Sequence, residues 1–367
     1  MNKILLIGNS GTKKHGNDGQ TIKVRLYLKK IRDEGFDVEF VDLESFLRRP
    51  ILTLKRIKIG IRSCDRIVLI SAHRGCKFLI PFINKINRKY KKPFVLPLIG
   101  ISVLHCSVDN LSDEEKSIFF SKKNYSLTKK NKKFAKELSK IDYILPETDI
   151  LVDIFKEFYG LNQVYKLNNF RECTLIKEHH SCSSAFRLVF LSRVTPVKGI
   201  FDLLDVVKSI SKEKNVMLDI YGAKNMTERD SEIFDTYLDG QVITYKGLID
   251  NKLVCDTISK YDLFVFPTRY YGEGTPGVIA ESLIAGVPVL TTDFPQSHFL
   301  LKDGVDSLFC KMLDKEDMKS KLLYIINNRQ VLATLKNGAK ESAKNYSYDT
   351  ERLSFLKYIC GIESKKM

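Results

Sequence analysis

Residues 263–290 decide the fold of this chain. They read Leu263-Phe-Val-Phe-Pro-Thr-Arg-Tyr-Tyr-Gly-Glu-Gly-Thr-Pro-Gly-Val-Ile-Ala-Glu-Ser-Leu-Ile-Ala-Gly-Val-Pro-Val-Leu290. The opening apolar run is typical of a buried strand, the glycines indicate a loop, and the apolar segment from Pro276 indicates a helix. A strand, a glycine-rich loop and a helix in this order present backbone N–H groups and a helix N-terminus to an anion.

The same alternation of strand and helix runs through all 367 residues. In the first half we predict strands at 3–8, 37–43, 66–71, 94–98 and 143–145, and helices at 20–34, 77–90 and 149–159. In the second half we predict strands at 187–192, 217–221, 242–246, 263–267 and 288–291, and helices at 199–211, 228–238, 251–260, 276–285, 315–327, 330–344 and 348–360. Strands that alternate with helices favour an α/β fold with parallel sheets.

A polar, irregular stretch at 167–184 interrupts this pattern, and we interpret it as a linker. The chain then divides into an N-terminal domain at 1–170 and a C-terminal domain at 185–345, followed by a last helix within 346–362. We expect two facing Rossmann-like domains with a cleft between them. Ligands of such sheets bind beyond the carboxyl ends of the strands, so both domains would line the cleft.

Two carboxylates frame the predicted anion site. Glu273 lies in the glycine-rich loop and Glu281 lies eight positions later, inside the helix. Carboxylates in these places can accept hydrogen bonds from hydroxyl groups on either side of a bound anion. The ligand that fits is a diphosphate with a hydroxylated ring at each end, which describes a nucleotide sugar. The alternative is that Glu281 is a solvated helix residue and that Glu273 complements the helix dipole.

Two cations follow another predicted strand, in the stretch Phe190-Leu-Ser-Arg-Val-Thr-Pro-Val-Lys-Gly199. Arg193 and Lys198 lie between the carboxyl end of the strand and the start of a helix. The guanidinium fork of an arginine and the point charge of a lysine both suit a diphosphate. The alternative is an ordinary surface loop.

A long glycine-containing loop follows the first strand, from Gly8 to Gly19, and lacks the G-x-G-x-x-G spacing of dinucleotide-binding folds. We take Gly11, Asn17 and Gly19 as its candidates for contact with a diphosphate or an acceptor hydroxyl. His73 and His105 also follow predicted strands, although an isolated histidine is more often structural. No spacing resembles a zinc site.

The positive charge is concentrated in the first half of the chain. Residues 1–170 hold 33 Lys and Arg against 18 Asp and Glu, whereas the remainder holds 27 against 26. Cations alternate with large apolar residues at 46–62 and 119–134, which suits an anionic membrane surface, or alternatively packed helices with polar outer faces. Residues 1–8 fit a first strand better than a signal peptide, and no apolar run is long enough to span a bilayer. The eight scattered cysteines indicate reduced thiols in a cytoplasmic protein.

The arrangement of Arg193, Lys198, Glu273 and Glu281 in the second of two Rossmann-like halves resembles the family-4 glycosyltransferases of the GT-B fold. The resemblance implies that the two cations bind the donor diphosphate, that Glu273 contacts the donor sugar and that Glu281 holds the ribose. It further implies that backbone amides of the Gly274-Thr275-Pro276-Gly277 segment approach the sugar and phosphates, that the base lies near Gly247 and Leu248, and that the last helix crosses back to the first domain.

The chain departs from the family pattern in two places. The second glycine of the loop, Gly277, is shifted by one position, and the histidine that the family carries in its first domain has no clear counterpart. His105 is followed by cysteine, and Gly100 is the candidate for the equivalent loop.

The function expected from this resemblance is a retaining, metal-independent transfer of a sugar, either a hexose or an N-acetylhexosamine. The donor would be a nucleoside-diphosphate sugar, with UDP favoured, and no separate cofactor is expected. The basic first half suggests a lipid-diphosphate-linked glycan as acceptor, surface or capsular polysaccharide synthesis as the setting, and a peripheral place at the inner face of the cell membrane. The alternatives are a nucleotide-sugar epimerase of similar fold and a nucleic-acid-binding protein that uses the basic half.

Overall fold

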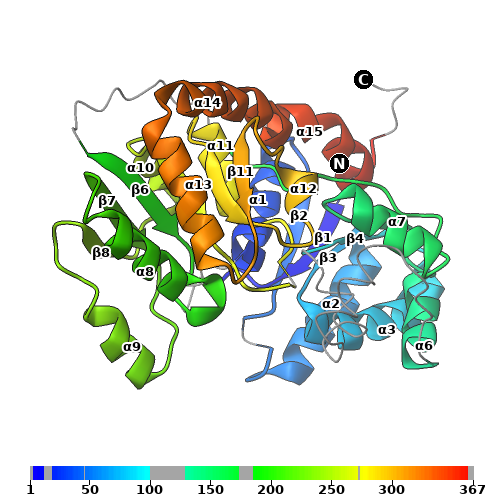
Figure 1. The fold of residues 1–367 in the computed structure, drawn as a ribbon. Coiled ribbons are helices and arrows are strands. Elements are labelled where there is room, and N and C mark those ends of the chain that lie inside the picture. Colours follow the sequence, from blue (N-terminus) through cyan, green and yellow to red (C-terminus); the bar gives the residue numbers. More distant parts are fainter. Residues whose placement is uncertain are drawn as a thin grey trace. The chain divides into compact units, whose positions relative to one another are not determined.

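The structure of the protein is a computed structural model, and the residues described are 3–11, 19–44, 46–99, 129–172, 185–271 and 273–362. The chain forms two compact units (Figure 1). The N-terminal unit comprises residues 1–169 together with 348–367, and the C-terminal unit comprises residues 170–347. The last segment of the chain therefore belongs with the first.

The N-terminal unit contains a parallel sheet of five strands in the order β2-β1-β3-β4-β5. This order is that of flavodoxin-like sheets, in which the strand order reverses between β1 and β3. The strands are β1 (Lys3–Gly8), β2 (Asp37–Asp42), β3 (Arg66–Ile70), β4 (Phe94–Pro97) and β5 (Tyr143–Leu145). The helices are α1 (Gly19–Asp33), α2 (Pro50–Ser63), α3 (His73–Tyr90), α6 (Lys129–Leu138), α7 (Asp149–Glu157) and α15 (Tyr348–Phe355).

The core of this unit forms where apolar helix faces meet the sheet. Helices α2, α3, α6 and α7 bury their aliphatic and aromatic residues in one cluster with Leu5 and Ile7 of β1. Helix α15 packs on α1 instead: the rings of Tyr27 and Phe355 meet edge to face with centroids 5.1 Å apart. A π-helical turn at Leu356–Cys360 follows α15 directly.

The C-terminal unit contains a parallel sheet of six strands in the order β11-β10-β9-β6-β7-β8. This is the Rossmann order, which reverses between β6 and β9. The strands are β6 (Phe186–Leu191), β7 (Val216–Tyr221), β8 (Ile243–Gly247), β9 (Leu263–Phe266), β10 (Val289–Thr292) and β11 (Ser307–Cys310). The helices are α8 (Ile200–Ile210), α9 (Glu228–Asp235), α10 (Val254–Ile258), α11 (Gly277–Ile284), α12 (Ser297–Leu300), α13 (Lys315–Asn327) and α14 (Arg329–Ala343), with 3₁₀ turns η1 (Pro196–Lys198), η2 (Asn251–Leu253) and η3 (Lys344–Tyr346).

Helices cover both faces of this sheet, because successive apolar residues of β6 point to opposite faces and both must be buried. Leu188 and Phe190 lie in a cluster with α8 and α13, whereas Val189 lies in a second cluster with α10, α11 and α14. Figure 1 shows α8 beside α13, and α11 beside α14. The predicted α/β class with two parallel, Rossmann-like sheets is confirmed.

The sequence prediction was wrong or incomplete for several elements. Helices α2, α6 and α12 and strand β11 were not predicted: α12 and β11 have only four residues each, and α2 and α6 lie in strongly basic stretches. Helix α3 begins at His73 rather than at residue 77. Helix α11 begins at Gly277, so Pro276 is its N-cap and not its first helical residue.

Gly199, in the loop after β6, lies against Pro267, the first residue after β9. Its φ is +73°, and a Cβ at this position would overlap the carbonyl oxygen of Pro267. Gly240 has almost the same φ, +72°, but no neighbouring atom would meet a Cβ there. The two positions therefore share the backbone strain of an L-residue, and only Gly199 adds a backbone clash.

We expect Gly199→Ala to lower the free energy of unfolding far more than Gly240→Ala. The left-handed conformation accounts for about 1–2 kcal/mol in both variants. The clash at residue 199 adds to this, because Pro267 cannot move without shifting the end of β9. Urea unfolding of the wild type and both variants measures the difference, and equal losses in the two variants would contradict the close approach.

Candidate functional site

The loops after β6 and β9 meet where the strand order of the C-terminal sheet reverses. Strands β6 and β9 are parallel neighbours, so the loops after them leave the same edge of the sheet. The Arg269 N–H donates to the carbonyl of Val197 at 2.9 Å, and the Arg269 side chain pairs with Asp202 on α8. These contacts fix the two loops to one another at the position where Rossmann sheets bind ligands.

Lys198 and Glu273 form a buried ion pair at this edge. Lys198 Nζ donates to both carboxylate oxygens of Glu273, at 2.5 and 2.6 Å, and each side chain is only 8% exposed. The hydroxyl of Thr268 donates to the same carboxylate at 3.3 Å, and the ring of Phe266 lies under the ammonium group. Because an ammonium group has three N–H donors, the pair leaves one for a further acceptor.

Arg193 lies in the loop that carries Lys198, but its side chain is exposed. In the part of the chain that the structure describes, no carboxylate lies within ion-pair distance of it. Val194, the next residue, anchors this loop through its backbone. Its N–H donates to the carbonyl of Ala223 and its carbonyl accepts from the N–H of Asn225, at 2.9 Å each. A guanidinium group that is held near the site and is not neutralised is suited to bind an anion.

Glu281 makes a second ion pair, with Arg171. Arg171 Nε donates to Glu281 Oε1 at 3.1 Å, and the two side chains are 7% and 13% exposed. Burial raises the pKa of the Glu281 carboxyl, and the charge and hydrogen bond of Arg171 oppose that rise. A Cβ on Gly277 would overlap the guanidinium group, so any larger residue at this position would displace Arg171 from the start of α11.

The loops after β7 and β8 extend this edge in one direction. The Gly222 N–H donates to the carbonyl of Gly247 at 2.8 Å, and the Tyr245 hydroxyl donates to the carbonyl of Gly222 at 2.8 Å. Gly247 has a φ of +75°, and Leu248 beyond it is 63% exposed. The structure thus places the predicted base-binding residues on an open loop at the same edge as Lys198.

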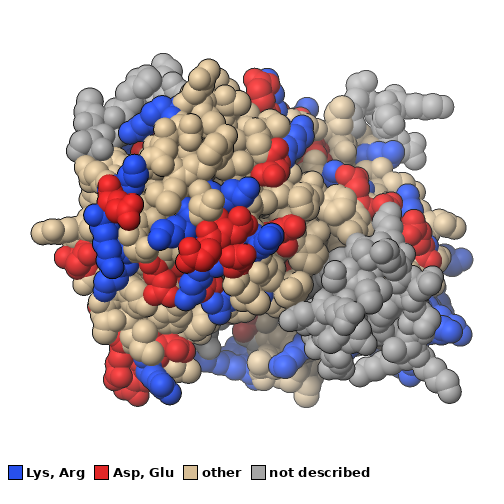
Figure 2. All heavy atoms as spheres, viewed as in Figure 1, with Lys and Arg blue, Asp and Glu red and all other residues tan. Residues whose placement is uncertain are grey.

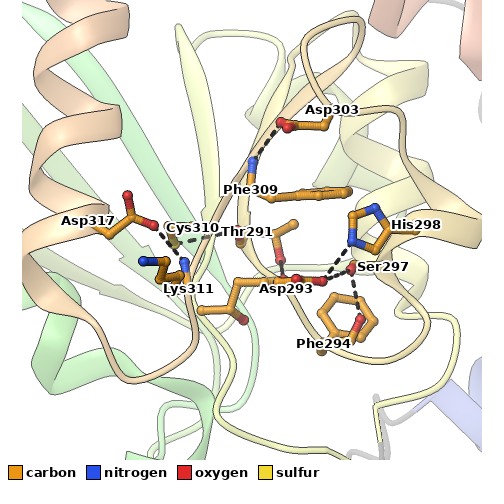
Figure 3. Close-up of polar contacts among 11 residues, drawn as sticks. Thr291, Asp293, Phe294, Ser297, His298, Asp303, Phe309, Cys310, Lys311 and Asp317 are labelled. Carbon is orange, nitrogen blue, oxygen red and sulfur yellow. Dashed lines mark hydrogen bonds and ion pairs between the residues drawn. The ribbon is translucent and has the colours of Figure 1, made fainter. Parts of the chain in front are cut away.

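The loops after β10 and β11 extend the edge in the other direction (Figure 3). Asp293 follows β10, and its carboxylate and the imidazole of His298 point toward one another, with 2.8 Å between Oδ1 and Nε2. The imidazole meets the ring of Phe309 edge to face, with centroids 4.4 Å apart. His298 and Asp293 are each more than half exposed, so this pair offers a hydrogen-bonding group beside the β9 loop.

The other predicted site residues lie in different parts of the structure. Gly274, Thr275 and Pro276 form the irregular segment between Glu273 and α11, where the anion-binding amides were predicted. Gly11 and Gly19 lie in the N-terminal unit, after β1 and at the start of α1. Asn17, Gly100 and His105 lie outside the described residues, and His73 is the first residue of α3.

Sequence reasoning missed two buried cations. Arg171 was assigned to an irregular linker, and no local motif signals its contact with Glu281, 110 positions away. In the N-terminal unit, Lys23 Nζ donates to Glu147 at 2.5 Å and to the carbonyl of Leu98 at 2.7 Å, with both charged side chains buried. A partial indication of this pair was present in the sequence, because Glu147 closely follows a predicted strand. Nothing in the sequence indicated that Lys23 would contact it.

One family model matches the C-terminal part of the chain. Residues 174–342 match the model of the family Glycosyl transferases group 1. That segment includes Arg193, Lys198, Glu273 and Glu281, and it begins just after Arg171.

Curated relatives match over limited parts of their length. An uncharacterized glycosyltransferase of Methanocaldococcus jannaschii is 25% identical over 161 residues, which are 44% of this chain and 44% of the relative. TuaC of Bacillus subtilis, which carries the name of a teichuronic acid biosynthesis glycosyltransferase, is 32% identical over 123 residues, or 34% of this chain and 26% of the relative. The chain thus spans less than half the length of these relatives.

Solved structures extend the likeness in fold to the whole chain. HepE of Anabaena, solved with UDP and glucose, has a TM-score of 0.72 at 14% identity, with 99% of this chain and 100% of that chain covered. Sucrose-phosphate synthase from Thermosynechococcus elongatus has a TM-score of 0.73 at 13% identity, with 98% of each chain covered. The protein therefore has the fold of the GT-B glycosyltransferases.

Proposed function

We propose that the protein is a glycosyltransferase that moves a sugar from a nucleoside-diphosphate sugar, favoured as a UDP-sugar, to an acceptor hydroxyl. The observation that carries the proposal is the buried Lys198–Glu273 pair with exposed Arg193 on the neighbouring stretch of loop, at the point where the strand order reverses. The match of residues 174–342 to the group 1 family supports it. So does the presence of UDP in the HepE structures of similar fold.

The proposed chemistry breaks the bond between the sugar's anomeric carbon and the diphosphate and forms a bond from that carbon to the acceptor oxygen, with retention at the carbon. The proton of the acceptor hydroxyl passes to the departing diphosphate. Negative charge grows on the departing diphosphate, where Arg193, the third N–H of Lys198 and the N-terminus of α11 would stabilise it. These groups supply the positive charge, so we propose a reaction that needs neither a metal ion nor a separate cofactor. Glu273 would orient the sugar and counter the positive charge that develops on it.

Glu281 would accept hydrogen bonds from the ribose hydroxyls. Arg171 favours the carboxylate form of Glu281 against the effect of burial, and in that form both oxygens act purely as acceptors. The open Gly247–Leu248 loop would receive the base. These roles follow the family resemblance, residue by residue.

The proposed acceptor is a lipid-diphosphate-linked glycan in surface or capsular polysaccharide synthesis, with the protein peripheral at the inner face of the cell membrane. The cationic excess of residues 1–170 supports this acceptor. No helix in the described ranges is long and apolar enough to cross a bilayer. TuaC, named for teichuronic acid synthesis, supports the same setting.

A nucleotide-sugar epimerase would share the donor site but release a free product without an acceptor. A nucleic-acid-binding protein would use the basic N-terminal half and have no need of the Lys198–Glu273 pair. Binding of a nucleotide sugar distinguishes a glycosyltransferase from a nucleic-acid-binding protein. Release of UDP that depends on an acceptor distinguishes it from an epimerase.

The test is a panel of nucleoside diphosphates and their sugars, measured by thermal unfolding. A ligand that binds only the folded protein raises its Tm, by an amount equivalent to about 2.7 kcal/mol at a hundred times Kd. We expect UDP and at least one UDP-sugar to raise the Tm in the presence of EDTA. The proposal is overturned if none of the nucleotides in the panel raises the Tm.

A further inference from the structure

Exposed aliphatic side chains gather on the outer face of α2 and on the loop before it. Leu47 is 93% exposed and Ile51 is 82% exposed. Half-exposed apolar side chains adjoin them: Leu52 and Ile59 on α2, and Phe78 on α3. The opposite face of α2 is buried in the core through Ile57 and Ile61. Helix α2 therefore buries one apolar face in the core and exposes further aliphatic side chains on the other.

Cations surround these apolar side chains. Residues 46–64 contain six Lys and Arg and no Asp or Glu. None of the six has a carboxylate within ion-pair distance among the residues that the structure describes, and Arg56 donates to the backbone carbonyl of Phe40. The C-terminal unit is different, because Figure 2 shows acidic and basic side chains interspersed over α8 and α13, where Lys315 pairs with Asp205. We call the exposed residues of 47–62 the α2 surface.

The α2 surface begins at the functional edge of its own unit. Strand β2 ends at Asp42, and α2 runs back from Pro50 to the start of β3, so Leu47 and Ile51 lie toward the carboxyl edge of the parallel strands. The Leu43 N–H donates to the carbonyl of Gly8, which places the start of this loop beside the loop after β1. Ligands of such sheets bind at this edge.

We propose that the α2 surface is a docking site for an anionic lipid bilayer. Leu47, Ile51 and Leu52 would enter the boundary between headgroups and acyl chains, and the lysines and arginines would lie at the level of the lipid phosphates. Long cationic side chains reach back to the headgroups while their stems cover apolar surface. The proposal deepens the proposed function, since a lipid-linked acceptor at this edge of the N-terminal unit would then be presented from the membrane.

Other anionic partners fit the α2 surface less well. Single-stranded nucleic acids bind on stacked aromatic side chains, whereas the exposed apolar residues here are aliphatic except for Phe78. An acidic protein partner would account for the cations but not for a nearly fully exposed leucine at the tip of a loop. A bilayer accounts for both in the same place.

The test is flotation of the full-length protein with vesicles of phosphatidylcholine, with or without phosphatidylglycerol. We expect binding to the anionic vesicles at low salt, weaker binding at high salt and little binding to neutral vesicles. Lys55→Gln with Lys58→Gln should lower the partition coefficient by about tenfold or more, since each cation near the surface contributes about 1 kcal/mol. Leu47→Ser with Ile51→Ser should also lower it, at unchanged charge.

The matched control is Lys212→Gln with Lys319→Gln, which removes the same charge from the C-terminal unit and should leave flotation unchanged. All the substituted side chains are at least partly exposed, and thermal unfolding confirms that each variant is folded. The proposal is overturned if the protein ignores anionic vesicles, if it binds nucleic acid in their place, or if the control lowers binding as much as the α2 variants. UDP stabilisation is measured on the same proteins, so a failure of the donor site is seen separately.

Discussion

Lys198→Met and Glu273→Gln are each expected to lower kcat/KM by about 10²-fold or more, the scale of losing one preorganised electrostatic group from a reaction centre. Lys198 loses its contact with the leaving diphosphate, and Glu273 loses the charge that faces the sugar. Steady-state assays of UDP release in the presence of acceptor measure the effect. Near-normal turnover in either variant would remove that residue from the mechanism.

The same substitutions also leave a buried charge without its partner, so loss of activity must be separated from loss of stability. Removing one member of a buried ion pair costs about 3–5 kcal/mol, whereas replacing both by neutral groups is often nearly neutral. We therefore expect the double variant Lys198→Met with Glu273→Gln to regain most of the free energy of unfolding and none of the activity. If the double variant regained turnover together with stability, the pair would be structural only.

Arg171→Ala is expected to weaken UDP binding by about tenfold or more near neutral pH, and by more as the pH falls. Burial already raises the pKa of Glu281 above its ordinary value of 4.5, and Arg171 opposes that rise. Without Arg171 the pKa rises further, so a larger fraction of Glu281 is protonated at any pH near that value. Calorimetric titration of UDP across a range of pH measures the change.

Two control variants test whether the effect of Arg171 depends on its charge and on Glu281. Arg171→Lys keeps the charge and should recover much of the affinity, whereas Glu281→Gln should bind weakly with little dependence on pH. Stability provides a second measurement: a carboxyl whose pKa is raised on folding binds more protons in the folded state, so stability falls as the pH rises from 4.5 through the folded pKa. That fall should extend to higher pH in Arg171→Ala. Affinity equal to the wild type at every pH would contradict the role.

The residues that sequence could place are those governed by local order. Lys198 and Glu273 each lie in the loop after an apolar strand, and the loops after parallel strands share an edge, so the order of residues along the chain was enough to predict that both lie at one site. Their ion pair was not predicted. The strand order that brings β6 beside β9 was not predictable in detail. It depends on which strands pair across the sheet and not on any one segment.

The features that sequence missed depend on contacts between distant parts of the chain. Arg171 contacts Glu281 across 110 positions, from a stretch with no regular structure to mark it. Helix α2 itself was not predicted, although the alternation of cations and apolar residues at 46–62 was interpreted as suited to an anionic membrane surface or to packed helices. The structure adds which of these apolar side chains are exposed, and that could not be predicted from the pattern.

The central claim is that the cations after β6 bind the diphosphate, and titration of UDP into Arg193→Ala tests it most directly. Arg193 is exposed and has no ion-pair partner in the described ranges, so its removal leaves the fold intact. Arg329→Ala is the matched control, because Arg329 lies against Phe186 at the opposite end of β6. We predict that Arg193→Ala raises the Kd for UDP by about tenfold or more while Arg329→Ala leaves it unchanged. Equal affinity in the wild type and both variants would contradict the account.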